Sequence, residues 1–133
     1  MKHTIRVVVV DDSISFREAL VSFLSGLPAL AVVGQAGNGM EAIELTRQVR
    51  PDVVILDFVM PRMDGIAATR ALKQLDPAPR VIVCTLVEDD LLHEMVLAAG
   101  ADAFLLKREV VQQIERLLHA QPRSLRRSAG WRS

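Results

Sequence analysis

The chain has 133 residues, 16 of them basic and 16 acidic, and half of its residues are apolar. That length and apolar content suit a single domain that buries roughly two thirds of its unfolded surface. The single cysteine, Cys84, excludes an internal disulfide framework and fits a reducing compartment. The apolar run at 7–10 ends at Asp11 and Asp12, too soon for a signal peptide or a membrane span, so we expect a cytoplasmic protein without membrane partners.

The net charge of zero conceals an uneven distribution. Residues 121–133 contain four arginines and no acid, which leaves 12 basic against 16 acidic residues in the remainder. The same segment lacks hydrophobic periodicity and contains Pro122 and Gly130. We therefore predict a mildly acidic folded domain over residues 1–120, followed by a basic flexible tail or a truncated linker over 121–133.

Five short apolar runs alternate with five helical patterns along the chain. The runs predict strands at 5–10, 30–33, 53–56, 81–84 and 103–106, apolar on both pleats. Between and after them, apolar residues recur at intervals of three and four, the period of an amphipathic helix. Strict alternation with short connections predicts an α/β fold with a doubly wound, five-stranded parallel sheet and right-handed crossovers.

Three local features give expectations that a structure can test. Ser15 and Glu18 have the spacing of a capping box at the start of the first helix. Residues 34–39 contain three glycines and predict a loop after the second strand. The buried stripe of the fourth helix should consist of Leu92, Met95, Val96 and Ala99.

Polar side chains end four of the five predicted strands. Asp11 and Asp12 follow the first strand, Asp57 the third, Thr85 the fourth and Lys107 the fifth. Because the carboxyl ends of parallel strands share one rim, these groups should meet there. Three clustered carboxylates repel one another unless a cation is present, and a ligand set made only of oxygens favours a hard ion such as Mg²⁺.

This set of groups fits the transfer of a phosphoryl group. Mg²⁺, the Lys107 ammonium and the Thr85 hydroxyl would bind the phosphoryl oxygens, while Asp57 on the central strand attacks phosphorus in line and forms an acyl phosphate. Taken alone, a lysine or threonine at a strand end is usually a solvated terminus, and Asp12 could simply cap a helix. The coincidence of four such strand ends favours the chemical interpretation.

The order and spacing of these residues resemble the receiver domain of two-component response regulators. The resemblance covers about residues 4–119 and rests on VVVVDDS (7–13), LDFVMPRMDG (56–65), Thr85 and AAGADAFLLK (98–107). The pattern is most similar to receivers of helix-turn-helix regulators. The resemblance implies a flavodoxin-like (βα)5 fold with strand order 2-1-3-4-5.

The resemblance also implies a metal site and a phosphoryl acceptor. Asp11, Asp12, Asp57 and the backbone carbonyl of Val59 would bind Mg²⁺ or Mn²⁺. Asp57 would accept the phosphoryl group from a histidine kinase.

Three further residues would respond to that phosphoryl group. Thr85 and Lys107 would contact it, and Phe104 would turn inward as Thr85 moves toward it. A phenylalanine in a short strand is ordinarily core, so the switch role of Phe104 depends on the resemblance.

The implied protein is a phosphorylation-controlled switch. It would change partner binding or dimerisation through a face built from the fourth helix, the fifth strand and the fifth helix. Its implied partners are a sensor histidine kinase or phosphotransfer protein and a second copy of the chain, with DNA only if an effector domain exists. It would modify only itself, by self-phosphorylation and slow self-dephosphorylation, so we expect no enzyme with a diffusible substrate.

Two alternatives stay open. The first is a phosphorylation-independent interaction module with the same fold, in which Leu86 obstructs the site. The second is a flavodoxin-like or phosphatase-like enzyme, which would need a second acid two residues beyond Asp57, where the sequence has Val59.

The sequence departs from the receiver pattern at four positions. Leu86 is bulkier than the small residue usual after the hydroxyl, which would slow entry of the phosphoryl group. Val59 and Val87 are apolar where the family orients the hydrolytic water, so we expect a long-lived phosphoryl state. Arg108 replaces the proline that often follows the lysine, which puts a cis peptide at that bond in doubt.

Overall fold

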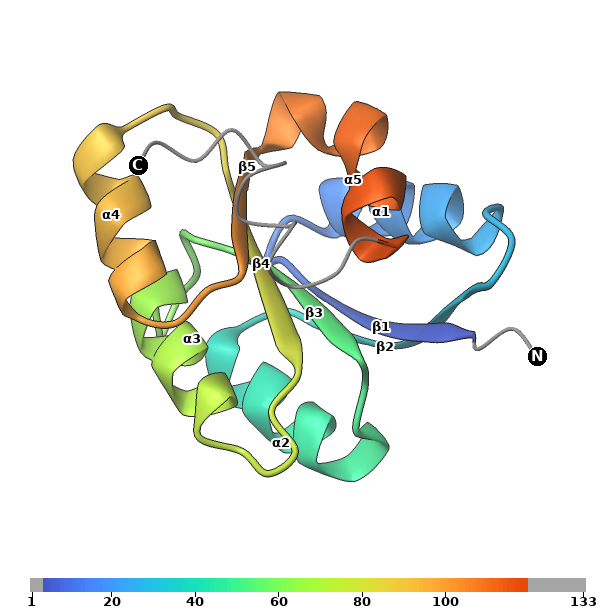
Figure 1. Cartoon of the computed structure of the whole chain (residues 1–133), viewed down its shortest axis with the longest axis horizontal. Coiled ribbons are helices and arrows are strands. Elements are labelled where there is room, and N and C mark those ends of the chain that lie inside the picture. The colour runs from blue at the N-terminus through green and yellow to red at the C-terminus, as the bar shows by residue number, and fades with distance from the viewer. Residues whose placement is uncertain (1–3, 120–133) are drawn as a thin grey trace.

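The computed structural model describes residues 4–119, so the predicted tail at 121–133 lies outside the described residues. Strands and helices alternate along the chain, in the order drawn in Figure 1. The strands are β1 (Ile5–Val10), β2 (Leu30–Ala36), β3 (Val53–Asp57), β4 (Arg80–Thr85) and β5 (Ala103–Leu106). The helices are α1 (Ile14–Ser25), α2 (Gly39–Val49), α3 (Gly65–Lys73), α4 (Asp90–Ala98) and α5 (Val110–His119), with a 3₁₀ turn, η1 (Lys107–Glu109), before α5.

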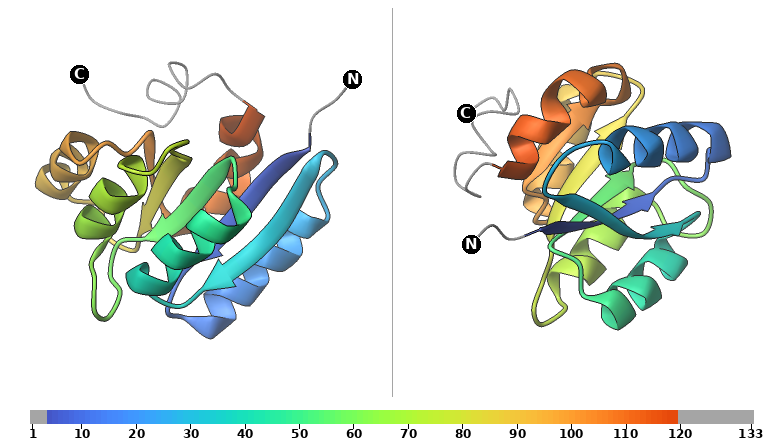
Figure 2. Two further views of the ribbon diagram at one scale, coloured as in Figure 1. Left: turned by 90° about the horizontal axis from the view of Figure 1, so that it is seen from below. Right: turned by 90° about the vertical axis from the view of Figure 1, so that its right-hand side faces the viewer.

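All five strands pair in parallel, in the order β2-β1-β3-β4-β5. Both the doubly wound flavodoxin-like architecture and the expected order are therefore confirmed. Helices α1 and α5 cover one face of the sheet, and α2, α3 and α4 cover the other, as the two views of Figure 2 show. The order reverses between β1 and β3, which is where ligands bind in open sheets of this kind.

The alternation of side chains along each strand divides the core into two layers. Val7, Val9 and Ile55 pack toward α1 and α5, whereas Val8 and Leu56 pack toward α2, α3 and α4. Because both faces are covered, the strands contain apolar residues at consecutive positions, as in the predicted runs.

Three local expectations were wrong. Ser13, not Ser15, caps α1, since its hydroxyl accepts from the backbone N–H of Phe16 at 3.4 Å. Strand β2 continues through Gly34 to Ala36 and pairs with β1 after a bulge at Val7/Val8. A Cβ on Gly34 would lie 2.8 Å from a methyl carbon of Leu45, so this glycine permits close helix packing and does not mark a loop.

The third of these errors concerns α4. Val96 is fully buried and Ala99 is 8% exposed, but the side chain of Met95 is 45% exposed. Helix α4 thus buries a narrower stripe than its apolar residues predict.

Two further findings bear on the sequence expectations. The cis peptide among the described residues is Asp76–Pro77, so the bond between Lys107 and Arg108 is trans. This agrees with the doubt about a cis bond there that the replacement of proline by Arg108 raised. None of the helices in the described part of the chain is long and apolar enough to span a bilayer.

Helix α5 offers a matched test of the core. Ile114 is fully buried, whereas Val111 on the same helix is 56% exposed. We predict that Ile114→Ala lowers the free energy of unfolding by about 2–5 kcal/mol, through lost burial and a residual cavity. Val111→Ala should change it by no more than about 0.5 kcal/mol. Urea denaturation of both variants checks this, and equal losses would contradict the assigned packing.

Candidate functional site at the carboxyl ends of the strands

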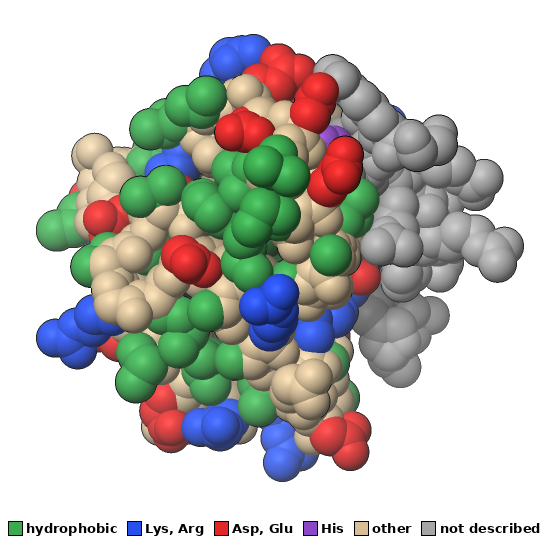
Figure 3. All heavy atoms as spheres, turned by 90° about the vertical axis from the view of Figure 1, so that its left-hand side faces the viewer, with side chains coloured by type: hydrophobic (Ala, Val, Ile, Leu, Met, Phe, Trp, Pro, Cys, Tyr) green, Lys and Arg blue, Asp and Glu red, His purple; other side chains and the backbone are tan. Residues whose placement is uncertain are grey.

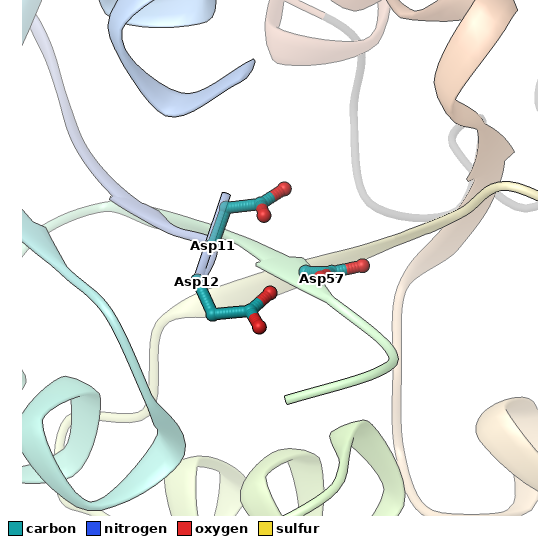
Figure 4. A group of neighbouring side chains, drawn as sticks. All are labelled: Asp11, Asp12 and Asp57. Carbon is teal, nitrogen blue, oxygen red and sulfur yellow. The ribbon is translucent and has the colours of Figure 1, made fainter. Parts of the chain in front are cut away.

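Three carboxylates from two neighbouring strands meet at the switch point of the sheet. Ligand oxygens of Asp11, Asp12 and Asp57 all lie within 4.8 Å of one another. Figure 4 shows the three side chains directed to the same side of the strand ends. Asp11 and Asp57 are buried, with 2% and 6% of their surface exposed, whereas Asp12 is exposed. The cluster is therefore shielded from water at Asp11 and Asp57 and open to solvent at Asp12, which marks the mouth of the site.

The register of the sheet aligns the ends of the central strands. Asp57, the last residue of β3, pairs with Cys84, and the next residue of β4 is Thr85, which pairs with Leu106. Lys107 follows directly on β5. Asp57 and Thr85 are thus the last residues of their strands, and Asp11 and Lys107 directly follow theirs, so the parallel pairing brings these side chains to one rim.

The segment after Asp57 folds back over the rim before α3 begins. The backbone N–H of Gly65 donates to the carbonyl of Phe58 at 2.8 Å, and a Cβ on Gly65 would lie 2.8 Å from the Cα of Phe58. Glycine is required by this close approach. The Asp64 carboxylate then accepts from the N–H groups of Ile66 and Ala67 and caps α3.

Asp11 is held in place by the start of α1. Its Oδ1 accepts from the backbone N–H of Ser13 at 2.8 Å, and its backbone carbonyl accepts from the guanidinium of Arg17 at 2.7 Å. Arg17 also donates to the side chain of Gln35 on β2, at 3.1 Å. Sequence reasoning had assigned no polar role to β2 or to Arg17, and the contact of Arg17 with Gln35 joins residues 18 positions apart in the sequence.

Lys107 brings a buried cation to two of the carboxylates. Its Nζ lies 2.7 Å from Oδ2 of Asp11 and 3.4 Å from Oδ1 of Asp57, and its side chain is only 9% exposed. The same Nζ lies 4.4 Å from the centroid of the Phe16 ring, a cation–π distance. The sequence placed Phe16 on the apolar stripe of α1 but gave no sign that it contacts Lys107.

The electrostatics of the cluster follow from burial and like charge. Burial, followed by the charge of Asp11, raises the pKa of Asp57 to about 6, against the lowering effects of Lys107 and of a backbone hydrogen bond with Val59. Burial alone would lower the pKa of Lys107, but its hydrogen bond to Asp11 and the charges of Asp57 and Asp11 raise it instead. Asp57 therefore carries a proton more readily than an ordinary aspartate, and Lys107 stays charged.

The two predicted switch residues are buried beside this cluster. Thr85 is 4% exposed at the end of β4, and Phe104 is 6% exposed on β5. The ring of Phe104 stacks on that of His93 from α4, with centroids 4.9 Å apart and an interplanar angle of 17°. Phe104 thus points inward and contacts α4, a helix contact that its position in a short strand did not reveal.

The remaining departures from the receiver pattern lie on the surface. Val59, Leu86 and Val87 are 68%, 73% and 67% exposed. The exposed Leu86 side chain is not packed into the carboxylate cluster. Val59 contributes a backbone hydrogen bond to Asp57.

The described residues match a known family model. Residues 7–119 match the response regulator receiver domain. The chain belongs to this family of receiver domains of two-component systems.

Similar proteins carry the receiver as one part of a longer chain. A protein-glutamate methylesterase/protein-glutamine glutaminase of Myxococcus xanthus is 47% identical over 104 residues, which are 77% of this chain and 30% of the relative. The response regulator GacA of Pseudomonas aeruginosa is 36% identical over 121 residues, 88% of this chain and 56% of the relative. The receiver domain of the putative response regulator NarL from Mycobacterium tuberculosis is 34% identical, with a TM-score of 0.81 over 90% of this chain and 99% of that one.

These relatives correct one expectation. We expected no enzyme with a diffusible substrate, and that inference was wrong, because several relatives are named as methylesterases and glutaminases. The chain spans about 30% of the length of the first of them, the receiver part. The prediction was made from residues of the receiver alone, which do not indicate whether a relative carries a catalytic domain. The comparisons show no enzymatic activity for this chain.

The raised pKa of Asp57 predicts how stability depends on pH without a metal. The folded-state pKa of about 6 lies above the ordinary value of 3.8, so the wild-type protein loses stability as the pH rises through this interval. Asp57→Asn removes that loss and should be more stable above about pH 7, by up to about 3 kcal/mol, with the advantage vanishing below about pH 4.

Thermal unfolding of both proteins across this pH range, in the presence of a chelator, measures the difference. An advantage of the asparagine variant that grows toward low pH would contradict the assignment. Asp76→Asn, at an exposed site, should show no such pH dependence.

Proposed function

We propose that the chain is a phosphoryl-accepting receiver in which Asp57 is the acceptor. The observation that carries this proposal is the position of the Asp57 carboxylate, at the end of the central strand, beside two further carboxylates and 3.4 Å from Lys107. A carboxylate whose charge is destabilised by burial and by Asp11 gains most from neutralisation by a metal or by a covalent bond.

The donor set fits a divalent hard cation. It consists only of carboxylate oxygens, two of them buried, with an exposed carboxylate, Asp12, at the mouth where coordinated water would remain. We propose that Asp11, Asp12 and Asp57 bind Mg²⁺ or Mn²⁺, with the Val59 carbonyl as a fourth ligand. The bound ion would screen the carboxylates from one another and neutralise negative charge on the phosphoryl oxygens.

The transfer step is an in-line displacement at phosphorus. An oxygen of the Asp57 carboxylate forms a bond to phosphorus while the bond from phosphorus to the donor nitrogen or oxygen breaks, and that donor atom takes up a proton. The product is an acyl phosphate on Asp57. Lys107 already contacts Asp57, so its ammonium can follow the oxygens of the new phosphoryl group, and the Thr85 hydroxyl can donate to another of them.

The output follows from the residues behind the site. Movement of Thr85 toward a phosphoryl group would leave space that Phe104 can fill, and Phe104 stacks against α4 through His93. We propose that this shifts the face formed by α4, β5 and α5 and so changes partner binding or homodimerisation. The proposed donor is a sensor histidine kinase or phosphotransfer protein in the cytoplasm, and any role in DNA binding would need an effector domain.

Phosphorylation from a small donor tests the acceptor directly. We predict that acetyl phosphate with Mg²⁺ adds one phosphoryl group, detected by intact mass, and that EDTA or Asp57→Asn reduces this to background. Asp76→Asn is the matched control, because it removes an exposed aspartate outside the cluster. Unchanged labelling of Asp57→Asn would overturn the assignment. Failure of both acetyl phosphate and beryllofluoride to act on the wild type would favour a phosphorylation-independent interaction module.

The apolar residues at the mouth predict a slow loss of the phosphoryl group. Val59 and Val87 are 68% and 67% exposed and carry no side-chain group that can orient a hydrolytic water. We predict a half-life well beyond seconds, and at least a severalfold shortening in a Val59→Asn, Val87→Glu double variant. Following the phosphorylated mass over time after removal of the donor checks this, and a wild-type half-life of seconds would contradict it.

A further inference from the structure

Lys107 is a cation that the fold keeps away from solvent. On the side of the molecule that carries α4, lysine and arginine side chains lie at the surface (Figure 3). The side chain of Lys107, in contrast, is only 9% exposed. Asp11 and Asp57 supply negative charge at 2.7 and 3.4 Å from its Nζ. The ring of Phe16 supplies an uncharged contact, with Nζ 4.4 Å above the ring centroid. The ammonium thus contacts two carboxylates and one aromatic face.

A short hydrogen-bonded segment fixes the ring of Phe16 and the carboxylate of Asp11 relative to each other. The backbone N–H of Ser13 donates to Oδ1 of Asp11 at 2.8 Å, and the Ser13 hydroxyl accepts from the backbone N–H of Phe16 at 3.4 Å. Phe16 lies in the first turn of α1 and packs, partly buried, against the core layer beneath α1 and α5. The ring and the carboxylate are therefore two fixed neighbours of the ammonium.

The contacts of the ammonium differ in strength and in kind. The distance to Asp11 is short and the distance to Asp57 is long. A carboxylate accepts directed hydrogen bonds, whereas the face of an aromatic ring attracts a cation through its quadrupole. The ring of Phe16 can therefore retain the ammonium while its N–H groups turn toward other acceptors. The oxygens of a phosphoryl group on Asp57 would be such acceptors.

We propose that Phe16 is a positioning residue for phosphoryl transfer, a role that rests on the function proposed for Asp57. Its ring keeps the Lys107 ammonium within reach of the oxygens that Asp57 receives. Without the ring, the flexible lysine side chain follows the nearer carboxylate, Asp11, and withdraws from the reacting group. The ring has no atom that can bind Mg²⁺, so its loss should lower the rate of transfer and leave the metal affinity unchanged.

Fluorination of the ring tests this role with little change of shape. Each fluorine withdraws electron density from the face of the ring and weakens its attraction for a cation. The full chain is made with phenylalanine at position 16, or with phenylalanine that carries one, two or three ring fluorines. The initial rate of phosphorylation by acetyl phosphate at saturating Mg²⁺, followed by intact mass, should fall with each fluorine, and about tenfold with three.

The same series at Phe23 is the matched control. Phe23 lies two turns further along α1, about 10 Å along the helix axis, and packs partly buried against the same core layer. Fluorination at Phe23 should change the rate by less than about twofold, and so should it change the Mg²⁺ affinity at either position, measured by calorimetry. Urea denaturation verifies that every variant is folded.

Ordinary substitutions show whether Phe16 acts through Lys107. Phe16→Leu should lower the rate about tenfold, and Phe16→Trp, which keeps an aromatic face, should retain most of it. In a Lys107→Gln background, Phe16→Leu should cause no further loss, because the cation that the ring positions is gone.

Four outcomes would overturn the inference. The first is a rate that stays constant across the Phe16 series, because a ring that only fills space is indifferent to its charge distribution. The second is an equal decline in the Phe23 series. The third is a loss of Mg²⁺ affinity that parallels the loss of rate, and the fourth is a full effect of Phe16→Leu in the Lys107→Gln background. A wild-type chain that takes up no phosphoryl group on Asp57 would refute the proposed function as well, whereas a labelled wild type with a flat Phe16 series would refute the role of Phe16 alone.

Discussion

The burial of two like charges at the end of a parallel sheet is the constraint on which the other features of the site depend. Asp11 and Asp57 are almost fully removed from water, and burial together with the charge of Asp11 destabilises the ionised form of Asp57. Lys107 compensates for this by contacting both, at 2.7 and 3.4 Å. Removing one partner from a buried ion pair typically costs about 3–5 kcal/mol, so the position of Lys107 is constrained by stability as well as by chemistry.

That constraint explains the structure around the cluster. Lys107 contacts Asp11 closely and Asp57 loosely, and the ring of Phe16 flanks the ammonium on α1. Arg17 and Ser13 fix Asp11 from the same helix. The first turns of α1 thus hold the Asp11 carboxylate and the Lys107 ammonium. Of the two buried carboxylates, Asp57 has the weaker contact with Lys107, and burial raises its pKa.

The sequence predicted the sheet and the rim because both depend on simple patterns. Strands covered on two faces are apolar at consecutive positions, and parallel pairing brings their carboxyl ends together. It could not predict contacts that join distant segments, such as Phe16 with Lys107, Arg17 with Gln35, or His93 with Phe104. It also misread Gly34, since a glycine that admits Leu45 and a glycine that makes a loop look the same in a sequence.

Helix α4 buries fewer of its apolar residues than the sequence predicted, because Met95 is exposed. Helix α4 presents Val96 and Leu92 to the core and His93 to Phe104, and it exposes Leu91 and Met95 on its outer side. Its buried stripe is narrow, and a narrow stripe anchors a helix less firmly than a wide one, because less apolar surface leaves water. A displacement of Phe104 would therefore act on helix α4, whose outer surface exposes Leu91 and Met95. A partner bound there would in turn favour one position of the helix, and by linkage it would alter the free energy of phosphorylation at Asp57 by the same amount that phosphorylation alters its binding.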